Sequence, residues 1–193
     1  MNLPNQLSIS RLVLTVPFVA LCYSGLANAQ SWALIVFGIA SFTDYLDGEI
    51  ARKRGLVTNF GKLFDPLADK ILMAAALTML AIEKQIPAWI VIAILSREFF
   101  VTGIRQIAVS QGVVLAAEKL GKHKLVWQVI TVLYFLMKAA SSEPMFAFTA
   151  PWFHWKPFSP EIFGKFLIYF TAALTLISGF SYYWKNRRLF SDA

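Results

Sequence analysis

Six long apolar runs, separated by short and mostly basic connections, constrain this chain more than any other feature. A helix needs about 20 largely apolar residues to cross a bilayer. Segments of this kind occur at residues 7–25, 31–52, 63–82, 87–110, 120–139 and 161–184. Lipid offers no partner for open backbone groups, and a helix satisfies those groups internally. The pattern predicts an all-α, polytopic membrane protein with six transmembrane helices in a single domain, residues 1–193.

Composition and the placement of charge agree with a membrane protein. Hydrophobic residues make up 58% of the chain and charged residues 15%, whereas soluble domains carry about 25% charged residues. The net charge of +7 could indicate nucleic acid, but the basic residues sit in short clusters between apolar runs, as in cytoplasmic loops on anionic lipid. We therefore expect membrane lipids as partners and no nucleic acid.

The first apolar run has two interpretations. Arg11, the run at residues 12–22 and the small residues Ala27-Asn28-Ala29 imitate a secretory signal with its cleavage site. The single positive charge comes late, however, and a polar segment precedes it. We favour a first membrane helix.

The charge of the connections predicts their side of the membrane. Basic clusters at 52–54 and 62, at 119–124 and at 185–188 fall on one side, while the lysines on the other side are offset by glutamates. Positive loops stay in the cytoplasm, so both termini are expected there, as an even number of helices requires. The connection at 140–160 carries four prolines and an aromatic cluster, which predicts an aromatic loop at the interface, of open role.

Four aspartates flank the second connection. Asp44 and Asp47 are spaced i, i+3 at the end of the second helix, and Asp65 and Asp69 are spaced i, i+4 at the start of the third, so each pair shares a helix face. Four carboxylates in a low dielectric repel one another, and hard divalent cations remove that problem. The spacing predicts two divalent metal ions, Mg²⁺ or Mn²⁺, at the cytoplasmic ends of helices two and three.

Simpler roles exist for single members of this cluster. Asp65 precedes Pro66 and could cap a helix, and Asp44 or Asp47 could be solvated at a helix end. All four together are harder to explain structurally, because intramembrane carboxylates are costly and usually functional.

The residues between the acids favour a bulky, charged ligand. Gly48 and Ala51 remove side-chain bulk beside the aspartates, although small residues also serve helix packing. Arg52 could pair with a phosphate or with one of the acids. Thr58 and Gly61 lie where the chain turns towards the third helix, and the hydroxyl could meet a phosphate or cap that helix.

Together these residues resemble the full signature of the CDP-alcohol phosphatidyltransferase family. The signature is present as Asp44-x-x-Asp47-Gly48-x-x-Ala51-Arg52, eight residues, then Gly61-x-x-x-Asp65-x-x-x-Asp69. The resemblance implies that Asp44, Asp47 and Asp65 ligate the metals, and that Asp69 joins the second metal site and acts as general base. It also implies homodimers and contacts to the CDP group at Asn5, Gly48, Ala51, Arg52, Thr58 and Gly61.

Two further stretches, beyond the signature, resemble the bacterial branch that makes phosphatidylglycerol phosphate. They are Ser96-Arg97-Glu98 followed by Arg105, and Gly121-Lys122-His123-Lys124; the opening Leu3-Pro4-Asn5 also fits. Ser8 and Leu125 depart from the branch, where threonine is more usual at both positions. The branch implies CDP-diacylglycerol as donor, glycerol 3-phosphate as acceptor and a place in the bacterial inner (plasma) membrane.

Glycerol 3-phosphate is dianionic and needs cationic partners. Arg105 lies eight residues after Arg97, two turns on and roughly on the same face. We expect Arg105 to bind the acceptor phosphate with Lys122 or Lys124, although these lysines could serve topology alone. Arg97 in an apolar helix needs a partner; Glu98 is adjacent rather than facing, so pairing across helices, with an aspartate as candidate, is expected, and Arg97 could be structural.

Two groups of alternatives stay open. The same chemistry could serve another acceptor, namely serine, inositol, inositol phosphate, choline or a second phosphatidyl group as in phosphatidylglycerol. A cation transporter could also use intramembrane acids as an ion path, but its ligands should lie near the middle of the membrane on several helices rather than crowd at one face.

Overall fold

The computed structural model describes residues 3–54, 59–113, 115 and 119–187, and gives side chains except within 3–8, 44–54, 59–69, 119–120 and 122. Six of the described helices have 21 to 26 residues. They are α1 (Leu3–Tyr23), α2 (Ala29–Arg54), α3 (Asn59–Ile82), α4 (Ala88–Ser110), α5 (Lys119–Ala140) and α7 (Lys165–Asn186). The all-α class is confirmed, and each long helix lies within a few residues of a predicted apolar run.

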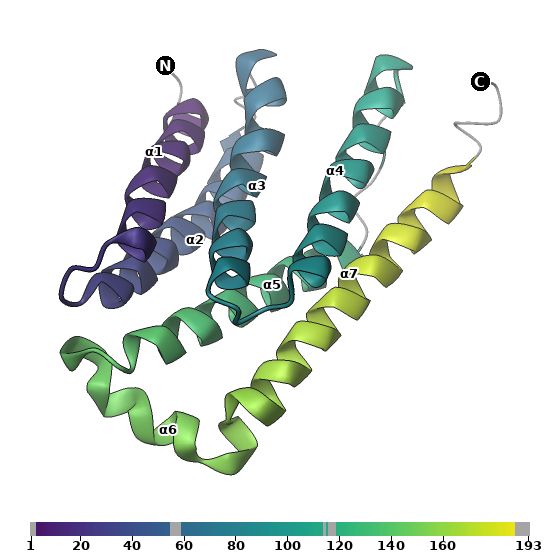
Figure 1. Ribbon diagram of the computed structural model, residues 1–193. Coiled ribbons are helices and arrows are strands. Elements are labelled where there is room, and N and C mark those ends of the chain that lie inside the picture. The colour runs from purple at the N-terminus through teal and green to yellow at the C-terminus, as the bar shows by residue number, and fades with distance from the viewer. Residues whose placement is uncertain (1–2, 55–58, 114, 116–118, 188–193) are drawn as a thin grey trace.

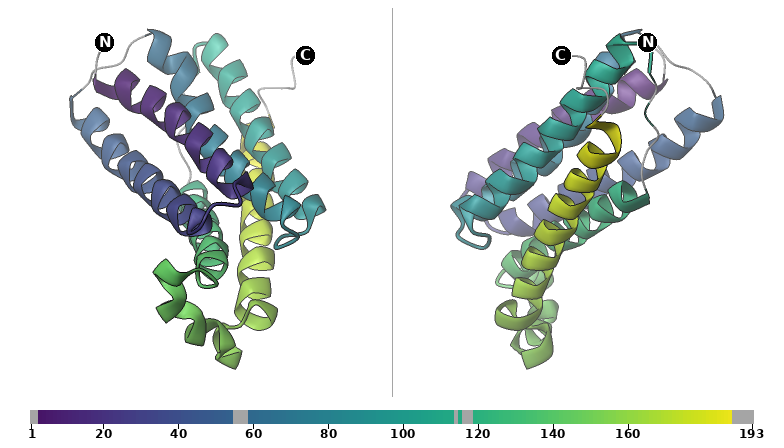
Figure 2. Two further views of the ribbon diagram at one scale, coloured as in Figure 1. Left: turned by 60° about the vertical axis from the view of Figure 1, so that its left-hand side comes forward. Right: turned by 90° about the vertical axis from the view of Figure 1, so that its right-hand side faces the viewer.

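The helices run up and down between two ends of the molecule. The start of α1, the start of α3 and the ends of α4 and α7 lie at one end, and the turns between α1 and α2 and between α3 and α4 lie at the other (Figure 1). Helix α1 packs against α2 and α3, while α7 packs against α4 and α5. The ends of α5 and α7 that flank α6 project beyond the turns of the other helices (Figure 2).

One apolar core joins these helices. Its largest fully buried side chains come from all six: Phe18, Phe37, Leu77, Leu80, Ile90, Phe135, Leu136 and Leu167. Many other large apolar side chains are exposed, among them Ile92 at 64% and Phe180 at 67%. Such a surface is typical of helices that face lipid.

Among the described residues, one helical stretch, Lys156–Asn186, is long and apolar enough to cross a membrane. A second candidate arises if His123–Ala140 and Pro144–His154, bent by 114°, count as one broken span. Shorter apolar helices cover Ile9–Tyr23, Ala29–Thr43 and Lys70–Ile82. The structure therefore supports one or two candidate spans together with further apolar helices.

The connection at 140–160 differs from the expected loop because it is built from short helical turns. These are η1 (Pro144–Thr149), α6 (Ala150–His154), η2 (Lys156–Phe158) and η3 (Pro160–Gly164). Each has a proline in its first or second position, where the fixed φ favours a helix and the missing N–H is not needed. The same prolines that break one long helix start several short ones.

Glu143 fastens this connection to the start of α2. Its carboxylate accepts hydrogen bonds from the backbone N–H groups of Gln30 at 2.9 Å and Ser31 at 2.8 Å, and from Ser31 Oγ at 2.6 Å. An anion at a helix N-terminus satisfies open donors and the helix dipole. Burial acts to raise the pKa of Glu143, but these hydrogen bonds outweigh it and lower the pKa below its ordinary value.

Candidate active site

The acidic signature lies on the two helix segments that flank residues 55–58. Helix α2 carries Asp44, Asp47, Gly48, Ala51 and Arg52 in its last three turns, and α3 carries Gly61, Asp65 and Asp69 in its first half. The side chains of these residues lie outside the described part, as does Thr58 entirely. Elsewhere in the described chain, no group of three or more His, Cys, Asp or Glu residues could hold a metal ion.

Glu98 of α4 organises a cluster of buried polar side chains beside this region. Its Oε1 accepts hydrogen bonds from Arg97 Nη1 at 3.3 Å, from Gln128 Nε2 at 3.4 Å and from Lys124 Nζ. Lys124 and Gln128 stand one turn apart on α5 and are 8% and 2% exposed. Two cationic partners offset the burial of this carboxylate, so Glu98 ties α4 to α5 through Lys124 and Gln128.

Arg97 extends the cluster to α7. Its Nη2 donates to Ser178 Oγ at 2.9 Å, and Arg97 is 8% exposed. Arg97 therefore reaches across helices, to Ser178, while the aspartates expected as its partner have side chains outside the described residues. The expectation that Glu98 would not face Arg97 is wrong. Adjacent helical residues differ by about 100° in direction, but the long arginine side chain bends back far enough to reach its neighbour.

Gly179 makes room for the Arg97 side chain. A Cβ at this position would stand 2.6 Å from Arg97 Cγ and 3.0 Å from its Nε. Only glycine therefore lets the Arg97 stem cross the surface of α7 at this height, which explains a glycine within a long helix.

Arg105, two turns further along α4, contacts α7 as well. Its Nε donates to the Tyr182 hydroxyl at 3.1 Å, and its guanidinium lies over the Tyr182 ring at 5.3 Å. Tyr182 is 3% exposed and packs with Val101 and Ile104, whereas Arg105 is exposed. Tyrosine thus holds the inner nitrogen of the guanidinium, and the two terminal nitrogens are further donors suited to an anion.

A small cavity lies between this cluster and α3. It measures ≈ 30 Å³, lies between α3, α4 and α5, and touches Lys70, Glu98 and Gln128. Lys70 directly follows Asp69. The polar cluster consequently borders the turn of α3 that carries the last aspartate of the signature.

The remaining expected residues lie on neighbouring helices. Asn5 belongs to α1 and Lys122 to α5, but their side chains are outside the described residues. Four cationic residues are expected at the acceptor. Two of them, Arg97 and Lys124, both bind Glu98. A third, Arg105, donates to Tyr182.

Sequence reasoning missed the polar partners on α5 and α7. Gln128 Nε2 also donates to Thr175 Oγ1 at 3.3 Å, next to the hydroxyl pair of Thr131 and Thr171 at 2.9 Å. A signal was available, since the polar residues of α7 recur on one face at Thr171, Thr175, Ser178 and Tyr182. Such helical spacing within an apolar helix indicates a face turned to other helices.

Comparison with known proteins agrees with the signature. The sequence profile described as CDP-alcohol phosphatidyltransferase matches residues 1–177. A Bacillus subtilis (strain 168) protein named CDP-diacylglycerol--glycerol-3-phosphate 3-phosphatidyltransferase is 37% identical, over 96% of this chain and 95% of its own. A Rickettsia typhi protein of the same name is 32% identical over 94% and 95%, respectively. A Mycobacterium tuberculosis (strain H37Rv) protein named probable phosphatidylglycerophosphate synthase is 38% identical over 70% and 66%. This chain belongs to the CDP-alcohol phosphatidyltransferase family, a family of membrane proteins.

Proposed function

We propose that this protein transfers the phosphatidyl group from CDP-diacylglycerol to glycerol 3-phosphate, giving phosphatidylglycerol phosphate and CMP. The complete acidic signature on α2 and α3 carries the proposal. The names of full-length relatives support the choice of donor and acceptor.

The reaction exchanges one phosphate ester for another. A hydroxyl oxygen of glycerol 3-phosphate attacks the β-phosphorus of CDP-diacylglycerol, the bond from that phosphorus to the bridging oxygen breaks, and CMP leaves with the electron pair. Asp69 accepts the proton of the attacking hydroxyl as general base. Contacts from Asn5, Gly48, Ala51, Arg52, Thr58 and Gly61 hold the CDP group.

The donor set fits a pair of divalent ions. The four carboxylates lie within 26 residues of sequence, on two helix segments that only residues 55–58 separate. They supply the hard oxygen ligands that Mg²⁺ and Mn²⁺ prefer. Asp44, Asp47, Asp65 and Asp69 would hold these ions. The chemistry that a bound pair supplies is neutralisation of the pyrophosphate and of the charge that develops on CMP.

Arg105 is the residue best prepared to bind the acceptor phosphate. It is exposed, it belongs to the last turns of α4, which lie at the same end of the molecule as the start of α3, and its Nε is the nitrogen that Tyr182 holds. The Lys124 ammonium is engaged by Glu98, so we assign it a secondary part, with Lys122 as a further contact. Arg97 is buried and bonded to Ser178 and Glu98, which supports a structural role.

The six long helices cross the bacterial inner membrane in this proposal. The acidic signature and both termini face the cytoplasm, from which CDP and glycerol 3-phosphate arrive, while the acyl chains enter from lipid. Basic connections on that side support this orientation. Association into homodimers remains a prediction.

An acceptor screen tests the proposal. Purified protein in detergent, given CDP-diacylglycerol and Mg²⁺, should release CMP with glycerol 3-phosphate and yield phosphatidylglycerol phosphate by mass spectrometry. Serine, inositol, inositol phosphate, choline and phosphatidylglycerol serve as competing acceptors. Release of CMP with one of these and not with glycerol 3-phosphate would overturn the choice of acceptor. Metal flux into proteoliposomes without lipid turnover would instead identify a cation transporter.

A further inference from the structure

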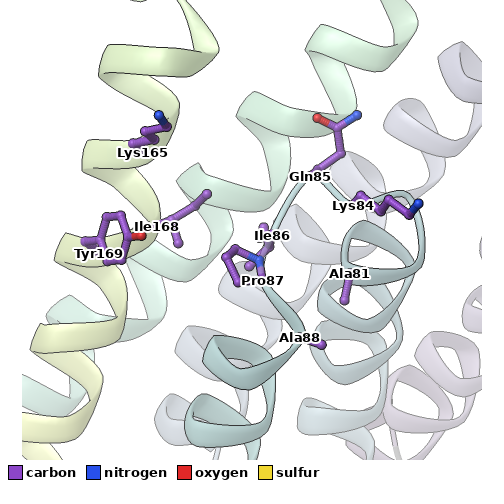
Figure 3. A pocket seen from close by; sticks show the side chains of 9 residues that line it. All are labelled: Ala81, Lys84, Gln85, Ile86, Pro87, Ala88, Lys165, Ile168 and Tyr169. Carbon is purple, nitrogen blue, oxygen red and sulfur yellow. The ribbon is translucent and has the colours of Figure 1, made fainter.

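A second cleft lies at the opposite end of the helices from the acidic signature. It separates the turn between α3 and α4 from the start of α7 and has a volume of ≈ 410 Å³. Ile168 and Tyr169 of α7 lie on one side of it, while Ile86 and Pro87 of the turn lie on the other (Figure 3). Its floor is apolar, and its polar groups come from Lys84, Gln85, Lys165 and Tyr169.

The cleft is lined by positive charge without a matching carboxylate. Lys84 and Lys165 are both exposed, and within the described part of the chain neither ammonium has a carboxylate oxygen within 4.0 Å. The neighbouring acid, Glu83, is directed towards α2, where its Oε1 accepts from Gln30 Nε2 at 3.3 Å. Glu83 is thus held towards α2, and among the described residues no glutamate or aspartate lines the cleft.

The other polar groups of the cleft are also hydrogen-bond donors. Gln85 Oε1 accepts from Lys138 Nζ at 3.2 Å, which leaves the amide nitrogen of Gln85 as the end that can donate to a ligand. The Tyr169 hydroxyl adds a further donor on α7, and Tyr169 is 55% exposed. The cleft thus offers two ammonium groups, an amide N–H and a phenol O–H as donors. These donors suit the oxygens of a phosphate better than they suit a neutral or a cationic ligand.

The backbone of Lys84 is unusual for a residue with a side chain. Its φ is 58°, a left-handed conformation that closes α3, with Gln85 N–H donating to Leu80 O at 2.9 Å. Glycine adopts this conformation without steric cost and is the common residue at such a helix end. A lysine here places a flexible cation at the outer edge of the turn, and its ammonium points away from Lys165 and Tyr169 of α7 (Figure 3).

We propose that this cleft binds the phosphodiester headgroup of an anionic phospholipid. Lys165 and the donors of Gln85 and Tyr169 take the phosphate, and the long side chain of Lys84 reaches it from the edge by rotating towards α7. On α4, whose first residue Ala88 lines the cleft, Trp89 at 62% exposure and Ile92 at 64% offer apolar surface for an acyl chain. Ammonium groups bind phosphate oxygens through charge-assisted hydrogen bonds.

This lipid site is separate from the proposed active site. From Asp69 to Ile82 the α3 helix advances by about 20 Å, so a lipid in the cleft cannot reach the acidic signature with its headgroup. A change in the cleft is expected to leave phosphatidyl transfer intact, and the lipid site does not depend on the proposed reaction.

Native mass spectrometry of the delipidated protein tests the site. We expect phosphatidylglycerol to bind more tightly than phosphatidylcholine. The ratio of the two affinities should fall about fivefold in Lys84→Gln or Lys165→Gln and about thirtyfold in the double variant. Lys156→Gln, which removes another exposed lysine at the same end of the molecule, serves as the matched control and should bind like the wild type. Thermal unfolding without lipid checks that each variant is folded.

Two results would overturn the lipid site. One is equal binding of the anionic and the zwitterionic lipid by the wild-type protein. The other is a folded Lys84→Gln/Lys165→Gln variant that keeps the full preference for phosphatidylglycerol. Neither result bears on phosphatidyl transfer, which the acceptor screen measures.

Discussion

Arg105 of α4 and Tyr182 of α7 form a joint contact: Nε of the arginine donates to the tyrosine hydroxyl at 3.1 Å, and the guanidinium lies over the ring at 5.3 Å. Since Tyr182 is buried and Arg105 is exposed, the tyrosine acts as a fixed support for a mobile cation. An arginine held by its inner nitrogen loses less conformational entropy when its outer nitrogens bind a phosphate.

Tyr182→Phe should therefore weaken the use of glycerol 3-phosphate. The ring remains and only the hydrogen bond to Arg105 is lost, so we expect KM for glycerol 3-phosphate to rise about fivefold, about 1 kcal/mol. The value of kcat and KM for CDP-diacylglycerol should change little. Steady-state kinetics of CMP release measure all three, with Tyr23→Phe, an exposed tyrosine at the other end of the molecule, as control. An unchanged KM would show that Tyr182 does not position Arg105.

Gly179→Ala should disturb the polar cluster from the α7 side. The new Cβ would stand 2.6 Å from Arg97 Cγ, in the middle of the side chain, so Arg97 must leave Ser178 or the helices must separate. We expect a loss of about 2 kcal/mol in unfolding free energy, measured by denaturation in detergent. Gly103→Ala, where no atom stands within 4 Å of the new Cβ, should be neutral or stabilising. Equal stability of both variants would contradict the close contact.

Glu143→Gln should loosen the attachment of the 140–160 connection to α2. The amide is uncharged and accepts with one oxygen only, so we expect a loss of about 0.5–1 kcal/mol. Ser31→Ala, which removes only the bond from Oγ, should lose less. The two variants are compared by thermal unfolding at pH 7.

The same contact predicts a dependence on pH. Because the pKa of Glu143 is lowered by folding, its contribution is fully present above its unfolded pKa of about 4.5 and disappears as the pH falls through the lower folded value. The stability difference between the wild type and Glu143→Gln should therefore be constant near neutrality and vanish in acid. A difference that does not shrink as the pH falls below 4.5 would show that the charge is not the cause.

Asp69→Asn should abolish phosphatidyl transfer while retaining much of the nucleotide binding. The amide cannot accept the proton of the attacking hydroxyl, but three aspartates remain to hold metal and CDP. Turnover is measured as CMP release, and binding by calorimetry with CDP in the presence of Mg²⁺. Turnover at the wild-type rate would refute the role of Asp69 as general base.

The positions of the long helices could be predicted because apolar runs and their breakers are local in the sequence. The α3–α4 turn, for example, follows from Glu83, Lys84 and Pro87 between two apolar runs. The turns within residues 140–160 were missed because a proline both ends one helix and starts the next. Which effect dominates depends on packing, here of Tyr134 among Phe153, Phe158 and Phe163.

The residues of the candidate site could likewise be predicted only in part from the sequence. The acidic signature could be found because its spacing is contained in 26 residues, and the need of Arg97 for a distant partner followed from its apolar surroundings. The identity of that partner, Ser178, and the support of Arg105 by Tyr182 lie 81 and 77 residues away. Hydropathy shows which face of α7 is polar, but only the packing of α4 against α7 determines which residues meet.

The central claim is that the aspartates of α2 and α3 jointly hold the metal ions on which transfer depends. Anomalous diffraction from crystals grown with Mn²⁺ and CDP tests this most directly, because it locates manganese independently of the protein atoms. We expect two Mn²⁺ positions, each within about 2.3 Å of carboxylate oxygens from both helices, and loss of at least one in Asp65→Asn. Aspartates directed to separate partners, with manganese absent from the space between them, would contradict it.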